Sequence, residues 1–125
     1  AAESMDFVVS VDAIFLAGKR FQEAFQEAYR VLRPGGWMVL TDLVQREGAS
    51  AAQMATVHGA LPLGANSLRT VATYQSNMQA LGFDAGVFQS HASNLPVHYA
   101  GIKAALQAAR KNGSVKDLSS SFLDK

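Results

Sequence analysis

The side chains best suited to proton transfer in this sequence are its three histidines, His58, His91 and His98. An imidazole has a near-neutral reference pKa, which suits a general base that takes a proton from an oxygen or nitrogen atom. The histidines lie 33 and 7 positions apart, a spacing that fits no metal-binding motif. His91, directly after a predicted strand, is the best candidate for a catalytic base. A surface or loop histidine is the alternative interpretation for all three.

Two aspartates follow apolar runs: Asp12 comes after the valine-rich stretch at 7–11, and Asp42 after the run that starts at Trp37. In open α/β sheets, ligands collect outside the carboxyl ends of the strands. We therefore expect Asp42 to face a substrate or to act as a catalytic base. Capping of the local backbone is the alternative for both aspartates, as is pairing of Asp42 with Arg46.

The elements that position these residues are two strands and a helix between them. The runs at 7–11 and 37–40 are apolar enough to predict strands buried on both faces, and the second strand is expected to extend to Leu43 or Val44. Residues 19–32 have apolar side chains on one helical face and polar ones on the other. Pro34 ends that helix, and Gly35 and Gly36 allow a tight turn. A strand, helix, turn and strand in this order predict a parallel βαβ unit of a doubly wound α/β sheet.

The second half of the chain is predicted to hold two clear helices and one weak strand. Residues 45–66 form a long loop with a short helix at 51–58, which we interpret as a mobile, mostly apolar lid. A helix is expected over 71–81, capped by Ser67 or Thr70 and ended by Gly82. A weak strand at 84–90 precedes a helix that ends at Gly113 and turns Ile102 and its neighbours inward. Trp37 and the phenylalanines of the first helix are expected in the core.

Length and composition exclude several classes of function. The chain has 125 residues, a formal net charge of +1 and no cysteine, so it offers one small core, no strongly basic nucleic-acid face and no disulfide framework. No apolar run is long enough to span a bilayer, and the first residues do not form a signal peptide. A cytoplasmic location and the absence of nucleic-acid and membrane partners are the resulting expectations.

Three motifs carry a resemblance to a known family. The segments MDFVVSVDAIF, EAYRVLRPGG and WMVLTDLV resemble the second half of class I S-adenosylmethionine-dependent methyltransferases, and VLRPGG before an apolar strand is the most specific of them. The greatest similarity is to enzymes for small molecules, such as the ubiquinone, sterol and natural-product methyltransferases. The segment YQSNMQALGFDAGVFQS resembles the next helix and strand of that family. The resemblance covers residues 5–90.

This resemblance implies a partial Rossmann-like doubly wound sheet, with the family's fourth, fifth and sixth strands and a missing N-terminal cofactor-binding half. The family's glycine-rich loop and ribose-binding acidic residue have no counterpart in this sequence, and Leu16 stands where many members carry a histidine. The resemblance further implies that residues 10–15 flank the methionine and methyl end of S-adenosylmethionine. The implied cofactor-binding residues are Ser10, Val11, Asp12 and Phe15, with S-adenosylmethionine bound only if the missing half is supplied.

An incomplete sheet of this kind has a physical consequence for the strand at 7–11. In the family's strand order this strand lies inside the sheet, whereas here it forms an apolar edge without the charge or proline that usually protects an edge. We expect a homodimer, a complementary subunit or a swapped segment to cover it.

The sequence therefore predicts one incomplete methyltransferase-like domain over residues 1–125, acting on a small molecule as a fragment or subunit and inactive alone. A natural split subunit and a truncation product are both compatible with this prediction. The alternative function is a non-catalytic assembly module that dimerises or binds a partner through its sheet edge.

Overall fold

The computed structural model describes residues 1–60, 68–84 and 86–113. Their contacts divide the chain into two units, residues 1–87 and residues 88–125. The first unit holds β1 (Met5–Val11), a 3-10 helix η1 (Ile14–Arg20), α1 (Phe21–Val31), β2 (Leu32–Thr41), α2 (Ala51–Ala60) and α3 (Val71–Leu81). The second unit holds a short 3-10 turn, η2 (Ala92–Asn94), and α4 (Leu95–Lys111). The single incomplete domain remains a prediction.

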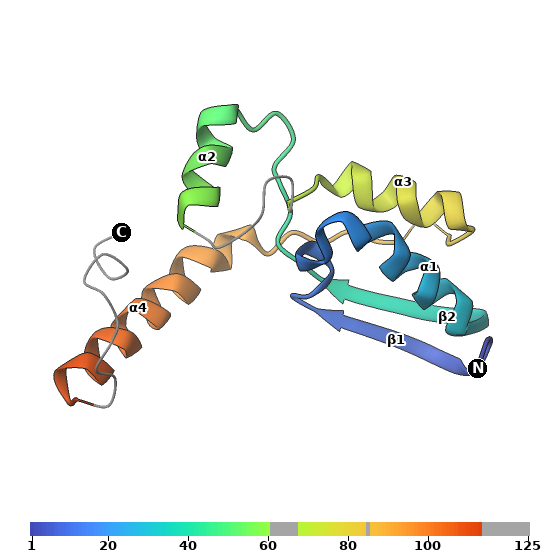
Figure 1. The fold of residues 1–125 in the computed structure, drawn as a ribbon, viewed down its shortest axis with the longest axis horizontal. Helices are drawn as coiled ribbons and strands as arrows, with labels where there is room; N and C mark the ends of the chain where they lie inside the picture. The colour runs from blue at the N-terminus through green and yellow to red at the C-terminus, as the bar shows by residue number, and fades with distance from the viewer. Residues whose placement is uncertain (61–67, 85, 114–125) are drawn as a thin grey trace. The chain divides into compact units, whose positions relative to one another are not determined.

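The two strands of the first unit pair in parallel, as the βαβ prediction requires (Figure 1). Phe7 lies opposite Trp37 and Val11 opposite Thr41, and the register shifts near Asp6. Such a pair needs a crossover connection, which η1 and α1 provide. The structure thus confirms the coarse prediction of an α/β fold with a small parallel sheet.

The passage from α1 into β2 is tighter than the predicted turn. Leu32 caps α1 with extended backbone angles and is also the first residue of β2. A Cβ atom on Gly36 would lie 2.9 Å from the Arg33 carbonyl oxygen and 3.0 Å from that of Asp6. A side chain at position 36 would therefore push β1 and β2 apart, so the second glycine serves close backbone approach.

The core of the first unit lies between the sheet and two helices, α1 and α3. Phe25 is fully buried, and its ring meets the rings of Phe21 and Tyr74 edge to face, with centroids 5.1 and 5.8 Å away. The phenylalanines of the first helix are therefore core residues, as predicted. The bounds of α3 also match the prediction, because the Thr70 side chain accepts a hydrogen bond from the Thr73 amide and Gly82 ends the helix in the left-handed conformation.

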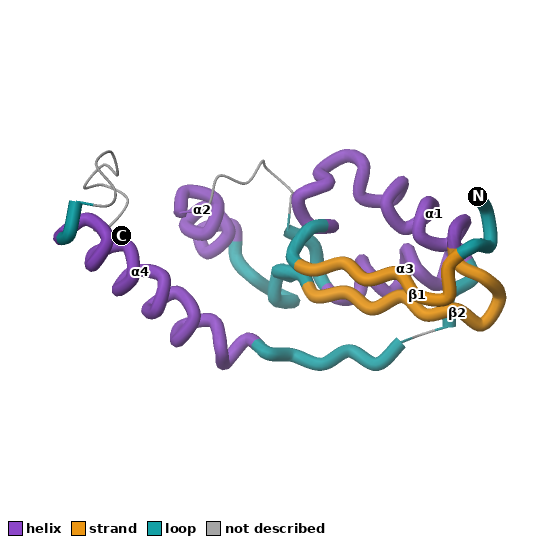
Figure 2. Tube along the Cα trace, turned by 90° about the horizontal axis from the view of Figure 1, so that it is seen from below, coloured by secondary structure: helices purple, strands orange, loops and turns teal. Residues whose placement is uncertain are grey.

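The opposite face of the sheet is exposed, which corrects two predictions. Side chains alternate along both strands. Val8 of β1 and Met38 of β2 face α1, while the residues next to them along each strand point away from it. We call the second set the outer face; it comprises Phe7, Val9, Val11, Trp37 and Val39, all exposed. Seen from below in Figure 2, β1 and β2 lie in front of α1 and α3. The prediction of strands buried on both faces is wrong here, and Trp37, 67% exposed, is not a core residue.

The remaining elements agree with the sequence only in part. Helix α2 confirms the short helix expected near 51–58, while residues 61–67 of the predicted lid lie outside the described residues. The expected strand at 84–90 does not form: its described residues pair with no other described backbone, and a strand requires such a partner. Helix α4 ends near Gly113 as predicted, but Ile102 is exposed and α4 buries none of its residues. The tail from 114 onward is not described.

Among the described residues, no helix has both the length and the apolar composition to cross a bilayer.

Candidate functional site

The carboxyl ends of β1 and β2 meet at one edge of the sheet, where Asp12 makes a sharp turn. Its amide donates a hydrogen bond of 2.8 Å to the Thr41 carbonyl oxygen, which extends the pairing of the two strands by one residue. Its backbone φ is +48°, in the left-handed region that aspartate tolerates better than most residues. The Asp12 side chain is exposed beyond the strand end. A carboxylate thus stands at the position where α/β sheets bind ligands.

Asp42 lies one residue beyond β2 and joins three segments of the chain. Its Oδ2 atom accepts hydrogen bonds from the Phe15 amide at 3.1 Å and from the Tyr74 hydroxyl at 2.8 Å. The carboxylate therefore connects the end of β2 to the start of η1 and to α3. Both partners are distant in the sequence, unlike the local backbone capping or the Arg46 pairing considered as alternatives from the sequence.

The surroundings of Asp42 favour its neutral form. Partial burial raises the pKa of this carboxyl, and the nearby Asp12 charge adds a smaller effect in the same direction. The hydrogen bonds from Tyr74 and the backbone oppose that shift without cancelling it. Oδ1 is buried and has no hydrogen-bond partner among the described residues. Asp42 is therefore a half-buried carboxylate with unused acceptor capacity at the strand ends.

The raised pKa of Asp42 predicts a specific dependence of stability on pH. Because the fold favours the protonated form, the contribution of Asp42 to stability is fully present below its ordinary pKa of 3.8 and is lost as pH rises through its higher pKa in the fold. We expect wild type to lose stability relative to Asp42→Asn as the pH rises above 3.8, measured by urea unfolding. Asp84→Asn, at an exposed position, is the control. A constant or inverse difference for Asp42→Asn would contradict this reasoning.

The residues predicted to bind cofactor do not share one surface. Ser10 faces α1 and lines a cavity on the inner side of the sheet, whereas Val11 belongs to the exposed outer face. Phe15 is buried, so only its backbone is available at the site, and its amide already bonds to Asp42. Asp12 alone among the four projects an exposed polar group at the strand end. The assignment of all four to cofactor binding remains a prediction.

His58 belongs to the first unit, whereas His91 and His98 belong to the second. His91 is exposed in the second unit, where its carbonyl oxygen accepts a hydrogen bond from the Asn94 amide. His98 packs its ring edge to face on Tyr99, and His58 lies near the end of α2. Across residues 1–60, 68–84 and 86–113, no group of three potential ligands could hold a metal ion. The catalytic roles of His91 and Asp42 remain predictions.

Two residues near the site make contacts that could not be predicted from the sequence. The hydrogen bond from the Tyr74 hydroxyl to Asp42 joins positions 32 residues apart. Arg69 donates a hydrogen bond of 2.5 Å to the Gly18 carbonyl oxygen, and its guanidinium lies 4.1 Å from the centre of the Phe21 ring. Both contacts are long-range in the chain, so periodicity and local motifs carry no signal for them.

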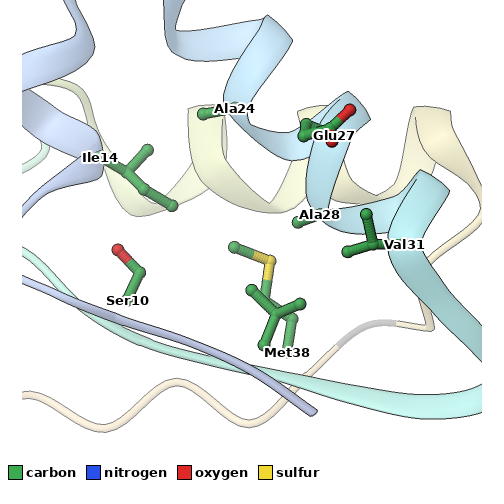
Figure 3. Close-up of a pocket in the computed structure, with 8 residues that line it drawn as sticks. Ser10, Ile14, Ala24, Glu27, Ala28, Val31 and Met38 are labelled. Atoms are coloured by element: carbon green, nitrogen blue, oxygen red, sulfur yellow. The ribbon is translucent and has the colours of Figure 1, made fainter. Parts of the chain in front are cut away.

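A cavity of about 330 Å³ lies between α1 and the inner side of the sheet (Figure 3). Six apolar side chains line it together with Ser10 and Glu27, and in the close-up Ser10, Ile14 and Met38 point toward the space below α1. Protein interiors are normally packed as densely as organic crystals. The space beside β1 is therefore incompletely filled by the described residues.

The small parallel sheet and its helices define an α/β protein, compatible with a partial Rossmann-like fold. A family model described as a methyltransferase domain matches residues 1–40. The chain is 29% identical over 111 residues to a sarcosine/dimethylglycine N-methyltransferase of Halorhodospira halochloris, a match that covers 89% of this chain and 38% of that protein. A protein of the same name from Aphanothece halophytica is 30% identical over 106 residues, covering 85% and 37%.

These matches support a class I S-adenosylmethionine-dependent methyltransferase, the class that the sequence motifs resemble. It spans less than two-fifths of the length of either curated relative. No solved structure gives a significant match.

Proposed function

We propose that this chain is the part of a small-molecule methyltransferase that holds the methyl acceptor next to the methyl end of S-adenosylmethionine, and that it is inactive alone. In this proposal the chain corresponds to the C-terminal half of the family's domain. The observation that carries the proposal is the meeting of Asp12 and Asp42 at the carboxyl ends of two parallel strands in a chain of this family.

Methyl transfer from a sulfonium is a direct displacement, so the protein's tasks are alignment, exclusion of water and, for some acceptors, removal of a proton. Asp12 is free to contact a ligand at the strand ends, and Asp42 has one unused oxygen beside it. The raised pKa of Asp42 brings this carboxyl closer to the range in which a carboxylate acts as a base. His91 is the second candidate base in the proposal.

The groups that hold the adenosine and ribose of the cofactor belong, in this proposal, to polypeptide outside the chain. Neither strand of the described residues is followed by a glycine-rich turn: Asp12 and Ala13 follow β1, and Asp42 and Leu43 follow β2. The relatives are named for sarcosine and dimethylglycine, so small amines are the acceptors to test first. Each of those acceptors carries a carboxylate, and the acidic site would need a cation from elsewhere to bind it.

Titration calorimetry with S-adenosylhomocysteine tests this division of the site. We expect no measurable binding to the chain alone, and binding once the chain is co-expressed with the part of the Halorhodospira halochloris relative that lies outside the match. Micromolar binding by the chain alone would refute the claim that it lacks the cofactor site. A stable complex of the two pieces that binds no cofactor would refute the proposed role in methyl transfer.

A second function is favoured by the exposed strand β1. Its apolar residues on the outer face suit a non-catalytic assembly module that binds a partner or dimerises. Mass spectrometry of proteins captured with the chain distinguishes this function, which predicts a partner without any requirement for S-adenosylmethionine.

A further inference from the structure

The 3-10 segment η1, between β1 and α1, is held at two points by side chains from distant parts of the chain. Near its start, the Phe15 amide donates its hydrogen bond to Asp42, directly after β2. At its kink, the Gly18 carbonyl oxygen accepts a hydrogen bond from the Arg69 guanidinium, 51 positions later in the chain. Gly18 has a φ of +55° and a ψ of −118°, angles that glycine adopts without steric strain. The conformation of η1 therefore depends on both anchors.

Arg69 is itself held in place on several sides. Its carbonyl oxygen accepts a hydrogen bond of 2.8 Å from the Gln45 amide, and Gln45 also forms a parallel bridge with Thr70, the cap of α3. Its guanidinium lies over the ring of Phe21, which is 4% exposed at the start of α1. Arg69 thus joins the segment after β2, the start of α1 and the start of α3.

These contacts form a closed ring beside the ends of β1 and β2. Asp42 and Gln45 lie three positions apart in the segment after β2. Gln45 bonds to Arg69, and Arg69 bonds to Gly18. Phe15, three positions before Gly18, completes the ring by its bond to Asp42. Residues in one hydrogen-bond network are energetically coupled, so loss of the Arg69–Gly18 bond is expected to affect Asp42.

We propose that Arg69 is a positioning residue of the site at the strand ends, which fixes the kink at Gly18 and thereby holds the Phe15 amide on Asp42. Arg69 acts through η1, which follows the turn at Asp12 after a single residue. Arginine suits this role because its planar guanidinium donates to a carbonyl oxygen and stacks on an aromatic ring at the same time. The inference rests on the proposed function, since it concerns the candidate base Asp42 and the exposed carboxylate of Asp12.

NMR spectroscopy of the chain measures this coupling without cofactor or methyl acceptor. In wild type, the chemical shift of the Phe15 amide proton is expected to change with pH as Asp42 ionises, because the amide donates to that carboxylate. Arg69→Met keeps an apolar side chain beside Phe21 and removes the donor to Gly18. We expect it to reduce the amplitude of the Phe15 change by about two-fold or more. Arg69→Lys keeps a charged donor and is expected to retain most of the amplitude.

Two further variants separate this role from general destabilisation. Arg46→Met is the matched control, because Arg46 is exposed and follows Gln45 directly, and we expect it to leave the Phe15 amplitude unchanged. Gly18→Ala is the second test if Arg69→Met does not fold. A Cβ atom on Gly18 meets no atom within 4 Å, so the change strains only the backbone angles that direct its carbonyl oxygen to Arg69. We expect Gly18→Ala to lower the Phe15 amplitude as Arg69→Met does.

Circular dichroism shows whether each variant is folded. A wild-type amplitude in folded Arg69→Met or Gly18→Ala, an equal loss in Arg46→Met, or an equal loss in Arg69→Lys would each overturn the proposal. If the coupling is as expected but the complex with the complementary piece binds no S-adenosylhomocysteine, the role of Arg69 stands and only the proposed function is refuted.

Discussion

Replacing Phe25 by alanine lowers the free energy of unfolding of the chain by about 3–5 kcal/mol, the usual cost of removing a buried aromatic ring. Phe25 is 0% exposed and lies against Phe21 and Tyr74, so its removal leaves an apolar hole between α1 and α3. Urea unfolding followed by far-ultraviolet circular dichroism measures the change.

Phe7→Ala is the matched control, because it removes the same ring from the exposed outer face. We expect it to cost about 1 kcal/mol or less in the isolated chain, the range of strand preferences. If Phe25→Ala and Phe7→Ala have equal costs, α1 does not pack on α3 as described.

Tyr74→Ala is the second large effect, and we expect a loss of about 3–5 kcal/mol in the free energy of unfolding. Tyr74 is buried in the same ring cluster, and its hydroxyl bonds to Asp42. Burial raises the pKa of Tyr74 above its usual value, and the hydrogen bond to Asp42 acts in the same direction. The neutral hydroxyl is therefore the form that the fold requires.

Tyr74→Phe separates the ring from the hydroxyl. It keeps the packing and removes one hydrogen bond to a half-buried carboxylate, for an expected loss of about 1–3 kcal/mol. In a double-mutant cycle with Asp42→Asn, the two losses are expected to be non-additive because the residues are in contact. Additive losses in the cycle would show that the Tyr74–Asp42 bond does not contribute to stability.

The local elements of the first unit follow closely from the sequence. Apolar spacing and the flanking polar residues predict α1, and the cap at Thr70 with the stop at Gly82 predicts the bounds of α3. These features depend on residues within a few positions of one another. The parallel pairing of β1 and β2 follows as well, since a helix between two strands requires it.

Features that depend on distant partners were not predictable in the same way. The stretch at 84–90 contains strand-forming residues, yet no described backbone pairs with it. Trp37 belongs to an apolar run that predicts burial. Such a run does not identify the segment that would pack on these side chains. In the described chain, nothing packed on the outer face covers it, and Trp37 is exposed.

The sequence alone indicated the family resemblance, the parallel βαβ unit and the presence of two aspartates after the strands, because these depend on residue type and local spacing. The tertiary structure decided that Asp42 bonds to Tyr74 and Phe15, that Phe15 is buried, and that one side of the sheet is left apolar and open. Each of these outcomes joins residues distant in the chain, or reflects a layer that other residues would have to supply. Their physical basis is packing and hydrogen bonding in three dimensions, which periodicity along one chain does not encode.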